Sequence, residues 1–66
     1  MNIYLNGEAR LVPDHCTAAQ LVEELGLAGK RIAMEVNREI IPRSSYVEHI
    51  LQPEDNIEIV HAIGGG

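Results

Sequence analysis

The last apolar segment of the chain, IEIVHAI at residues 57–63, places the strongest limit on the fold. Its apolar residues form two alternating sets: Ile57, Ile59 and Ile63 on one side, and Val60 and Ala62 on the other. A strand that is apolar on both faces is typical of the interior of a sheet rather than of its edge. The pattern therefore predicts that the last strand along the chain lies in the middle of the sheet.

The first strands form a predicted β-hairpin around Asn6-Gly7, because Asn-Gly is a strong signal for a tight turn. A two-residue loop would bring Arg10 onto the face that carries Ile3. A three-residue loop would instead place Leu11 opposite Ile3 and gather the apolar side chains on one face. We therefore predict the three-residue loop, with a bulge among its residues.

One short helix of about 8–9 residues is predicted after the hairpin. Thr17 is suited to the N-cap position, and Gln20 three residues later completes a capping box. Gly26 stands where a left-handed residue commonly ends a helix. The apolar stripe of this helix comprises Ala18, Leu21, Val22 and Leu25.

A second strand pair follows the helix. Alternating apolar residues at 32–36 predict a strand, Asn37-Arg38 predicts the turn, and Pro42 stops the returning strand. A capping pattern at Ser45 predicts a short helical turn, and a proline-led turn in QPEDN precedes the last strand.

The fold class that follows is α+β: a ubiquitin-like β-grasp with a five-stranded mixed sheet, one main helix on one face and a short helical turn. The last strand would lie beside the first. Residues 1–63 would form the β-grasp domain, and residues 64–66 would be a flexible C-terminal glycine tail.

Size and charge limit the function. A chain of 66 residues is one domain with little room for both a core and a catalytic site, so a carrier or binding module is favoured over an enzyme. The net charge of −5 argues against nucleic acid and favours a partner with a basic surface. A single cysteine, no signal peptide and no apolar run of about 20 residues predict a cytoplasmic protein that does not enter membranes.

Gly64, Gly65 and Gly66 are the main candidates for chemistry. Fully extended, they reach about 10 Å beyond Ile63 and can enter a channel too narrow for side chains. A terminal carboxylate with a reference pKa of about 3.3–3.7 is ionised at neutral pH and needs activation, for example as an acyl-adenylate. Composition alone equally allows a frayed terminus without function.

Several motifs together carry a family resemblance: VN followed by IPR at residues 36–43, an acidic turn before IEIV, and the ending GG. With the opening IYLNGEA and the helix CTAAQLVEELGL, the whole chain resembles the ThiS family, the sulfur carriers of thiamin thiazole biosynthesis. It departs from that family at Tyr46, where Trp is often found, and at residues 53–55, where PED stands in place of the common Asp-Gly-Asp.

The resemblance implies that an E1-like adenylating enzyme of the ThiF type uses ATP to adenylate the carboxylate of Gly66. Sulfur from a cysteine desulfurase relay would displace AMP to leave a thiocarboxylate, and thiazole synthase of the ThiG type would take up that sulfur. The chain would bind no cofactor and catalyse no step. Gly65 would let the chain bend in the partner's channel, Gly64 would extend its reach, and Ile63 would be the last residue anchored to the sheet.

A partner surface is predicted near the last strand. Glu54, Asp55 and Glu58 would form an acidic face for a basic patch on the activating enzyme, and His61 and Ile63 would lie close to that partner. His61 is also interpreted as a half-exposed sheet residue.

The cysteine and the histidines are weaker candidates for function than the glycines. Cys16 precedes a helix N-terminus, which would lower the pKa of a relay thiol, yet free cysteine more often packs as a small apolar residue. His15, His49 and His61 lack the spacing of metal ligands, so no metal site is expected.

Two alternatives to the thiazole pathway stay open. The small subunit of molybdopterin synthase would share the fold and the tail chemistry. A β-grasp interaction module with an inert tail would share the fold alone.

Overall fold

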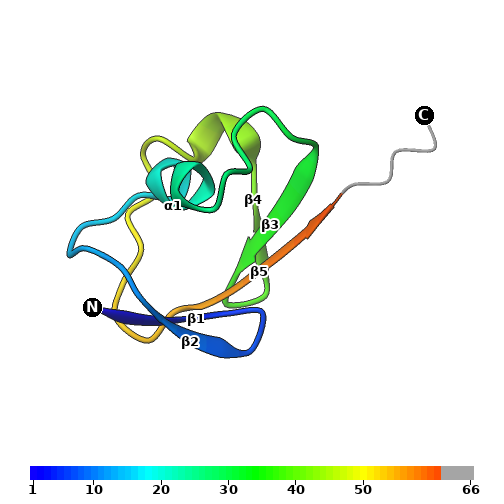
Figure 1. The fold of residues 1–66 in the computed structure, drawn as a ribbon. Helices are drawn as coiled ribbons and strands as arrows, with labels where there is room; N and C mark the ends of the chain where they lie inside the picture. The colour runs from blue at the N-terminus through cyan, green and yellow to red at the C-terminus, as the bar shows by residue number, and fades with distance from the viewer. Residues whose placement is uncertain (62–66) are drawn as a thin grey trace.

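The computed structural model describes residues 1–61 of the chain. Its elements are β1 (Asn2–Leu5), β2 (Glu8–Leu11), α1 (Ala18–Glu24), β3 (Ile32–Val36), β4 (Glu39–Ile41), the 3-10 turn η1 (Arg43–Ser45) and β5 (Asn56–His61). The sheet has the order β2-β1-β5-β3-β4, and α1 lies on the concave side of that sheet (Figure 1). This is the β-grasp arrangement that the sequence predicts. The expected domain boundary at residue 63 lies outside the described residues.

Strand β5 occupies the centre of the sheet, as predicted, parallel to β1 and antiparallel to β3. Ile57 and Ile59 are buried on the face that α1 covers. Val60 points to the opposite face and is 60% exposed. The strand is thus central although only one of its two apolar sides is buried: hydrogen bonding on both edges, rather than burial on both faces, gives it this place.

The first hairpin has the register that the sequence analysis rejected. Ile3 faces Arg10, and the loop has two residues, Asn6 and Gly7, with φ values of 49° and 86°. Two positive φ angles define a type I′ turn, whose twist matches that of the strands, so turn geometry decides the register. Arg10 lies half-buried on the core face, and its guanidinium reaches Glu24 at the end of α1 (Nη2–Oε1 3.8 Å).

Helix α1 begins and ends as predicted, although it has seven residues. The Gln20 N–H donates to Thr17 Oγ1 (3.1 Å) and the Thr17 N–H donates to Gln20 Oε1 (2.9 Å), which forms the capping box. At the other end Gly26 has a φ of 72°, and the Leu27 N–H donates to the Val22 carbonyl (2.9 Å). These two features are those of a Schellman motif.

The second strand pair turns at Asn37-Arg38, as predicted, with φ values of 51° and 70°. The predicted cap at Ser45 is wrong: η1 begins after Pro42, has no side-chain cap, and contains Ser45 itself. Pro42 pre-sets the backbone for this turn, whose cap position therefore lies three residues earlier than the polar pattern indicates.

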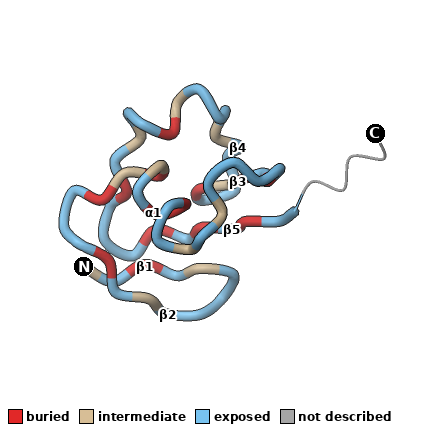
Figure 2. The backbone as a smooth tube through the Cα atoms, turned by 45° about the horizontal axis from the view of Figure 1, so that its top comes forward, coloured by how far each residue is buried: buried red, intermediate tan, exposed pale blue. Residues whose placement is uncertain are grey.

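The core lies between α1 and the covered face of the sheet, where the buried stretches of the backbone gather (Figure 2). Its fully buried large side chains are Ile3, Leu21, Met34, Leu51 and Ile57, together with Cys16. Burial of this aliphatic set is the main stabilising term for a domain of this size.

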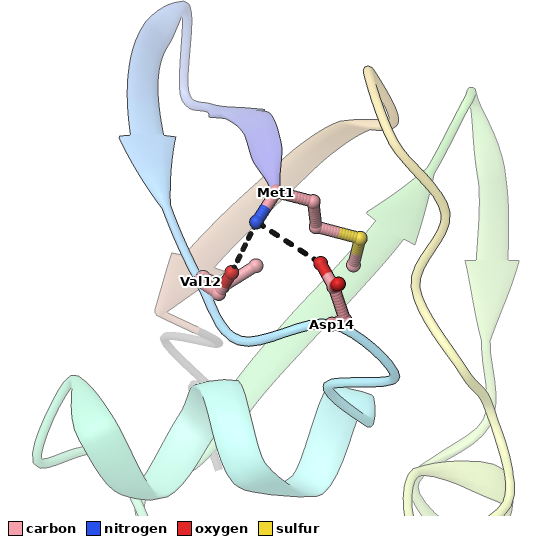
Figure 3. Close-up of polar contacts among 3 residues, drawn as sticks. All are labelled: Met1, Val12 and Asp14. Carbon is pink, nitrogen blue, oxygen red and sulfur yellow. Dashed lines mark hydrogen bonds and ion pairs between the residues drawn. The ribbon is translucent and has the colours of Figure 1, made fainter.

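The open end of the first hairpin is closed by polar contacts around Met1 (Figure 3). The Met1 amino group donates to the Val12 carbonyl (2.6 Å) and lies 3.4 Å from Asp14 Oδ1. The Val12 N–H in turn donates to the Met1 carbonyl (2.9 Å). These contacts hold β1 and β2 together at the end opposite the Asn6-Gly7 turn.

Candidate functional site

The candidate site is the C-terminal end of β5, because the glycines predicted to carry the chemistry follow it in the sequence. Gly64, Gly65 and Gly66, and the expected anchor Ile63, lie outside the described residues. The part of the site that the structure describes is therefore the strand that leads into them, as far as His61.

Strand β5 is held on its two edges over different lengths. On one edge β3 pairs with it from Ile57 to His61. On the other edge the pairing with β1 ends at Ile57, opposite Leu5. The side chain of Asn6 then takes over: its Oδ1 accepts from the Ile59 N–H (2.9 Å) and its Nδ2 donates to the Ile59 carbonyl (3.2 Å). Sequence reasoning missed this contact and treated Asn6 as a turn residue only.

The open face of the sheet, on the side away from α1, carries a mixed apolar and acidic surface beside this site. Glu58 on β5 lies directly opposite Glu35 on β3. The ion pairs found among residues 1–61 are Met1–Asp14 and Arg10–Glu24, so neither of these two carboxylates takes part in one. Exposed apolar side chains on the same face are Tyr4, Leu11, Ile40 and Val60.

Of the predicted acidic partner residues, Glu54 and Glu58 are exposed but Asp55 is not. Asp55 is 8% exposed; its Oδ1 accepts from Asn37 Nδ2 (2.9 Å) and its Oδ2 accepts from the Gln52 N–H (2.8 Å). The prediction that Asp55 belongs to an exposed acidic face is therefore wrong, because the carboxylate holds the turn that leads into β5.

Glu54 and His61 lie at opposite ends of β5. Glu54 precedes the strand, in the turn led by Pro53, and has a φ of 70°, the left-handed geometry required of the second inner residue in a type II turn. His61 is the last residue of the strand and is exposed, rather than half-exposed as expected. At about 3.3 Å per residue the two are separated by more than 20 Å, so a partner at the C-terminal end of β5 meets His61 and not Glu54.

Cys16 lies in the core and is not part of the site. Its side chain is 1% exposed and its thiol donates to the Thr17 carbonyl (3.5 Å). Burial, assisted by the negative charge of Glu24, raises the pKa of this thiol. The helix N-terminus was expected to lower that pKa, and desolvation outweighs it. Cys16 thus has the character of a packed apolar residue.

Neither a metal cluster nor a membrane-crossing helix was found in the part of the chain that the structure describes. No three of the described His, Cys, Asp and Glu side chains gather where they could hold a metal ion. No helix within residues 1–61 combines the length and the apolar character that a membrane span requires.

The ThiS family model matches residues 3–66. The sulfur carrier protein ThiS of Escherichia coli is 32% identical over 66 residues, covering 100% of both chains. The ThiS protein of Bacillus subtilis is 38% identical over 65 residues, covering 97% of this chain and 98% of the relative.

Thiazole synthase of Magnetococcus marinus is 41% identical over 66 residues, which is all of this chain but only 20% of that protein. The chain therefore spans about a fifth of the length of such relatives. Among solved structures, the crystal structure of the thiamine biosynthesis protein ThiS from Geobacter metallireducens has a TM-score of 0.87 at 25% identity and covers 100% of both chains. A family model that matches nearly the whole chain, relatives of equal length and a structure of the same fold lead to one conclusion: the chain belongs to the ThiS family.

Proposed function

We propose that this chain is a sulfur carrier for thiazole formation in thiamin biosynthesis, with the carboxylate of Gly66 as the group that carries sulfur. Two findings support this. ThiS of Escherichia coli, named a sulfur carrier, aligns over its full length. In the thiazole synthases of Magnetococcus marinus and Paramagnetospirillum magneticum, a region similar to this chain makes up 20% of the protein, which favours thiazole synthase as the acceptor.

The chemistry begins with activation, because an ionised carboxylate is a poor acyl donor. Gly66 attacks the α-phosphate of ATP on a ThiF-type enzyme, and pyrophosphate leaves to give an acyl-adenylate. A persulfide from the desulfurase relay then attacks the acyl carbon and AMP leaves, which gives an acyl disulfide. A second thiol cleaves its S–S bond, so that a new disulfide forms and the thiocarboxylate is released. ATP is thus a substrate of the partner, and the chain is a co-substrate rather than a catalyst.

The observation that carries the proposal is the position of β5. This strand leads into the glycines, and it is the central strand, paired with β3 as far as His61 and held by Asn6 at Ile59. A reacting group that must reach the centres of two different partners needs a fixed base. Gly64 and Gly65 are proposed to pass through the partner's channel, where side chains would collide.

We further propose that the activating enzyme contacts the end of β5, through Glu58 on the open face, through His61, which alternation places on the other side of the strand, and through Ile63. The facing carboxylates of Glu58 and Glu35 favour a basic group on the partner, since like charges directly opposite each other are unfavourable when unpaired. Glu54, at the far end of β5, is proposed to contribute only through long-range steering.

The proposal is tested by intact mass spectrometry after incubation with ATP, a ThiF-type enzyme and a desulfurase with cysteine. The mass is expected to rise by the difference between one sulfur and one oxygen atom. A variant that lacks Gly66 serves as the control and is expected to keep its mass. No gain in the full chain, under conditions that load another ThiS protein, would contradict the proposal and would favour an interaction module with an inert tail.

A further inference from the structure

The two edges of β5 differ in how far their strand neighbours extend. β3 follows β5 to its last described residue, His61, where the partner is Ile32. β1 stops four residues earlier, at the pair of Leu5 with Ile57. Without another contact, the last part of β5 would have one hydrogen-bonded edge, and strands paired on one side twist and fray more readily than strands paired on both.

Asn6 fills the position that the next residue of β1 would occupy. Its backbone N–H still donates to the Ile57 carbonyl (2.8 Å), and its φ of 49° then turns the main chain away into the hairpin loop. The side-chain amide continues in the direction of the strand and satisfies both the N–H and the carbonyl of Ile59 (2.9 and 3.2 Å). A carboxamide has the same donor and acceptor as a peptide group, so Asn6 extends β1 by one pair of hydrogen bonds.

The second type I′ turn provides an internal comparison. Asn37 holds the equivalent first position there, and it also contacts β5: its Oδ1 accepts from the Asn56 N–H (3.0 Å) and its Nδ2 donates to Asp55 (2.9 Å). These contacts lie at the start of β5, whereas those of Asn6 lie two residues before its described end. Asn6 and Asn37, each in the first position of a type I′ turn, thus form hydrogen bonds to opposite ends of β5.

We propose that Asn6 is a positioning residue: through its two hydrogen bonds to Ile59 it sets the direction of β5 at its last described residue, His61, and so presents the reacting terminus to its partner enzymes. This inference rests on the proposed function for its kinetic consequence. The structural consequence, a β5 held on both edges as far as Ile59, stands on the hydrogen bonds alone.

Loss of the two hydrogen bonds between Asn6 and Ile59 has a defined kinetic signature. If the direction of β5 at His61 varies among the molecules, only a fraction of them presents the terminus productively. The apparent affinity for the partner then falls by that fraction. Molecules that do bind productively react as before. The expected effect is therefore a higher KM for the carrier with an unchanged kcat.

The test compares Asn6→Gly with the matched variant Asn37→Gly. Glycine keeps the positive φ of each turn, so both hairpins are retained. Each variant loses two side-chain hydrogen bonds: those to Ile59 in Asn6→Gly, and those to Asp55 and Asn56 in Asn37→Gly. Pyrophosphate release by the activating enzyme is measured against carrier concentration. For N6G, KM is expected to rise about threefold or more at constant kcat; for N37G, KM is expected to stay within about twofold of the unaltered chain.

Amide hydrogen exchange supplies a readout that needs no enzyme. The Ile59 amide is compared with the Tyr4 amide, which donates to the Asp55 carbonyl (2.9 Å) and takes no part in the contact between Asn6 and Ile59. N6G is expected to raise the Ile59-to-Tyr4 exchange ratio about tenfold, the scale of one hydrogen bond, and N37G is expected to leave or lower that ratio.

The outcomes separate the two proposals. Equal KM values for N6G and N37G, or a fall in kcat alone, would overturn the positioning role. If the Ile59-to-Tyr4 exchange ratio stays unchanged in N6G, Asn6 does not hold Ile59 and the structural part of the proposal is overturned. Failure of the unaltered chain to release pyrophosphate would contradict the proposed function, and the exchange ratio would still decide whether Asn6 holds β5.

Discussion

The two faces of the sheet use the same strands for different purposes. On the covered face, Ile57 and Ile59 of β5 belong to the buried core and have almost no exposed surface. On the open face, the intervening residues Glu58 and Val60 are exposed, and Glu58 stands opposite another glutamate. The alternation teaches that stability comes from one set of side chains and that the other set is free to serve recognition, because successive residues of a strand point to opposite faces.

The largest expected effect comes from a pair of truncations on β5. Ile57→Ala is expected to lower the free energy of unfolding by about 2–5 kcal/mol, since it removes buried methylenes and leaves a cavity. Val60→Ala is expected to change it by less than about 0.5 kcal/mol, since that side chain is 60% exposed. Urea unfolding followed by circular dichroism measures both, and similar losses for the two variants would break the comparison between the faces.

A smaller effect is expected at the acidic turn before β5. Asp55→Ala leaves the backbone N–H of Gln52 and the side-chain Nδ2 of Asn37 without their acceptor and is expected to cost about 1–3 kcal/mol. The neighbouring exposed Glu54 is the matched control, and Glu54→Ala is expected to be near neutral. The free energy of unfolding of each variant is the measurement. A neutral Asp55→Ala would mean that this carboxylate is free for a partner, as the charge pattern first indicated.

On the open face, Glu58 is expected to lower stability and to favour binding of the activating enzyme. Glu58→Gln removes a repulsion with Glu35 and is expected to raise the free energy of unfolding by about 0.2–1 kcal/mol. The same change is expected to raise KM for the activating enzyme and to weaken the salt dependence of that KM, because a charge contact with a basic partner is lost. The control is Glu23→Gln on the exposed side of α1. Stabilisation without a change in KM would show that the open face is not the docking face.

The smallest effect is expected from Cys16 at neutral pH. The folded state raises the pKa of this thiol, so it favours the neutral form. Its contribution to stability is therefore complete below the ordinary thiol pKa of about 8.5 and is lost as the pH rises above that value. Unfolding measured from about pH 7 to 10 is expected to show a decline that Cys16→Ala lacks. That variant is also expected to gain sulfur at Gly66, and its failure to do so would revive a relay role.

The elements that the sequence predicts correctly depend on local chemistry. The capping box of Thr17 and Gln20 and the turn at Asn37-Arg38 each involve neighbours in the chain, so the pattern suffices. The central position of the last strand also follows from the sequence, although exposed Val60 indicates that the apolar pattern alone overstated burial.

The first error arose because the apolar pattern was weighed above turn chemistry: the type I′ loop at Asn6-Gly7 sets the register and brings Arg10 onto the core face, near Glu24 at the end of the helix. The other errors arose where a distant group decides the outcome. Asp55 is buried by contacts that include Asn37, 18 residues away. The contact of Asn6 with Ile59 spans 53 residues and uses the side chain of a residue whose backbone already explains its presence in a turn.

The central claim is that sulfur travels on the end of this chain into a thiazole. The most direct measurement uses a carrier loaded with a heavy sulfur isotope as its thiocarboxylate, incubated with thiazole synthase and the other thiazole precursors. We expect the heavy sulfur in the thiazole ring, in an amount equal to the carrier that returns to the carboxylate form. A thiazole without the label, formed while the loaded carrier keeps its sulfur, would contradict the account.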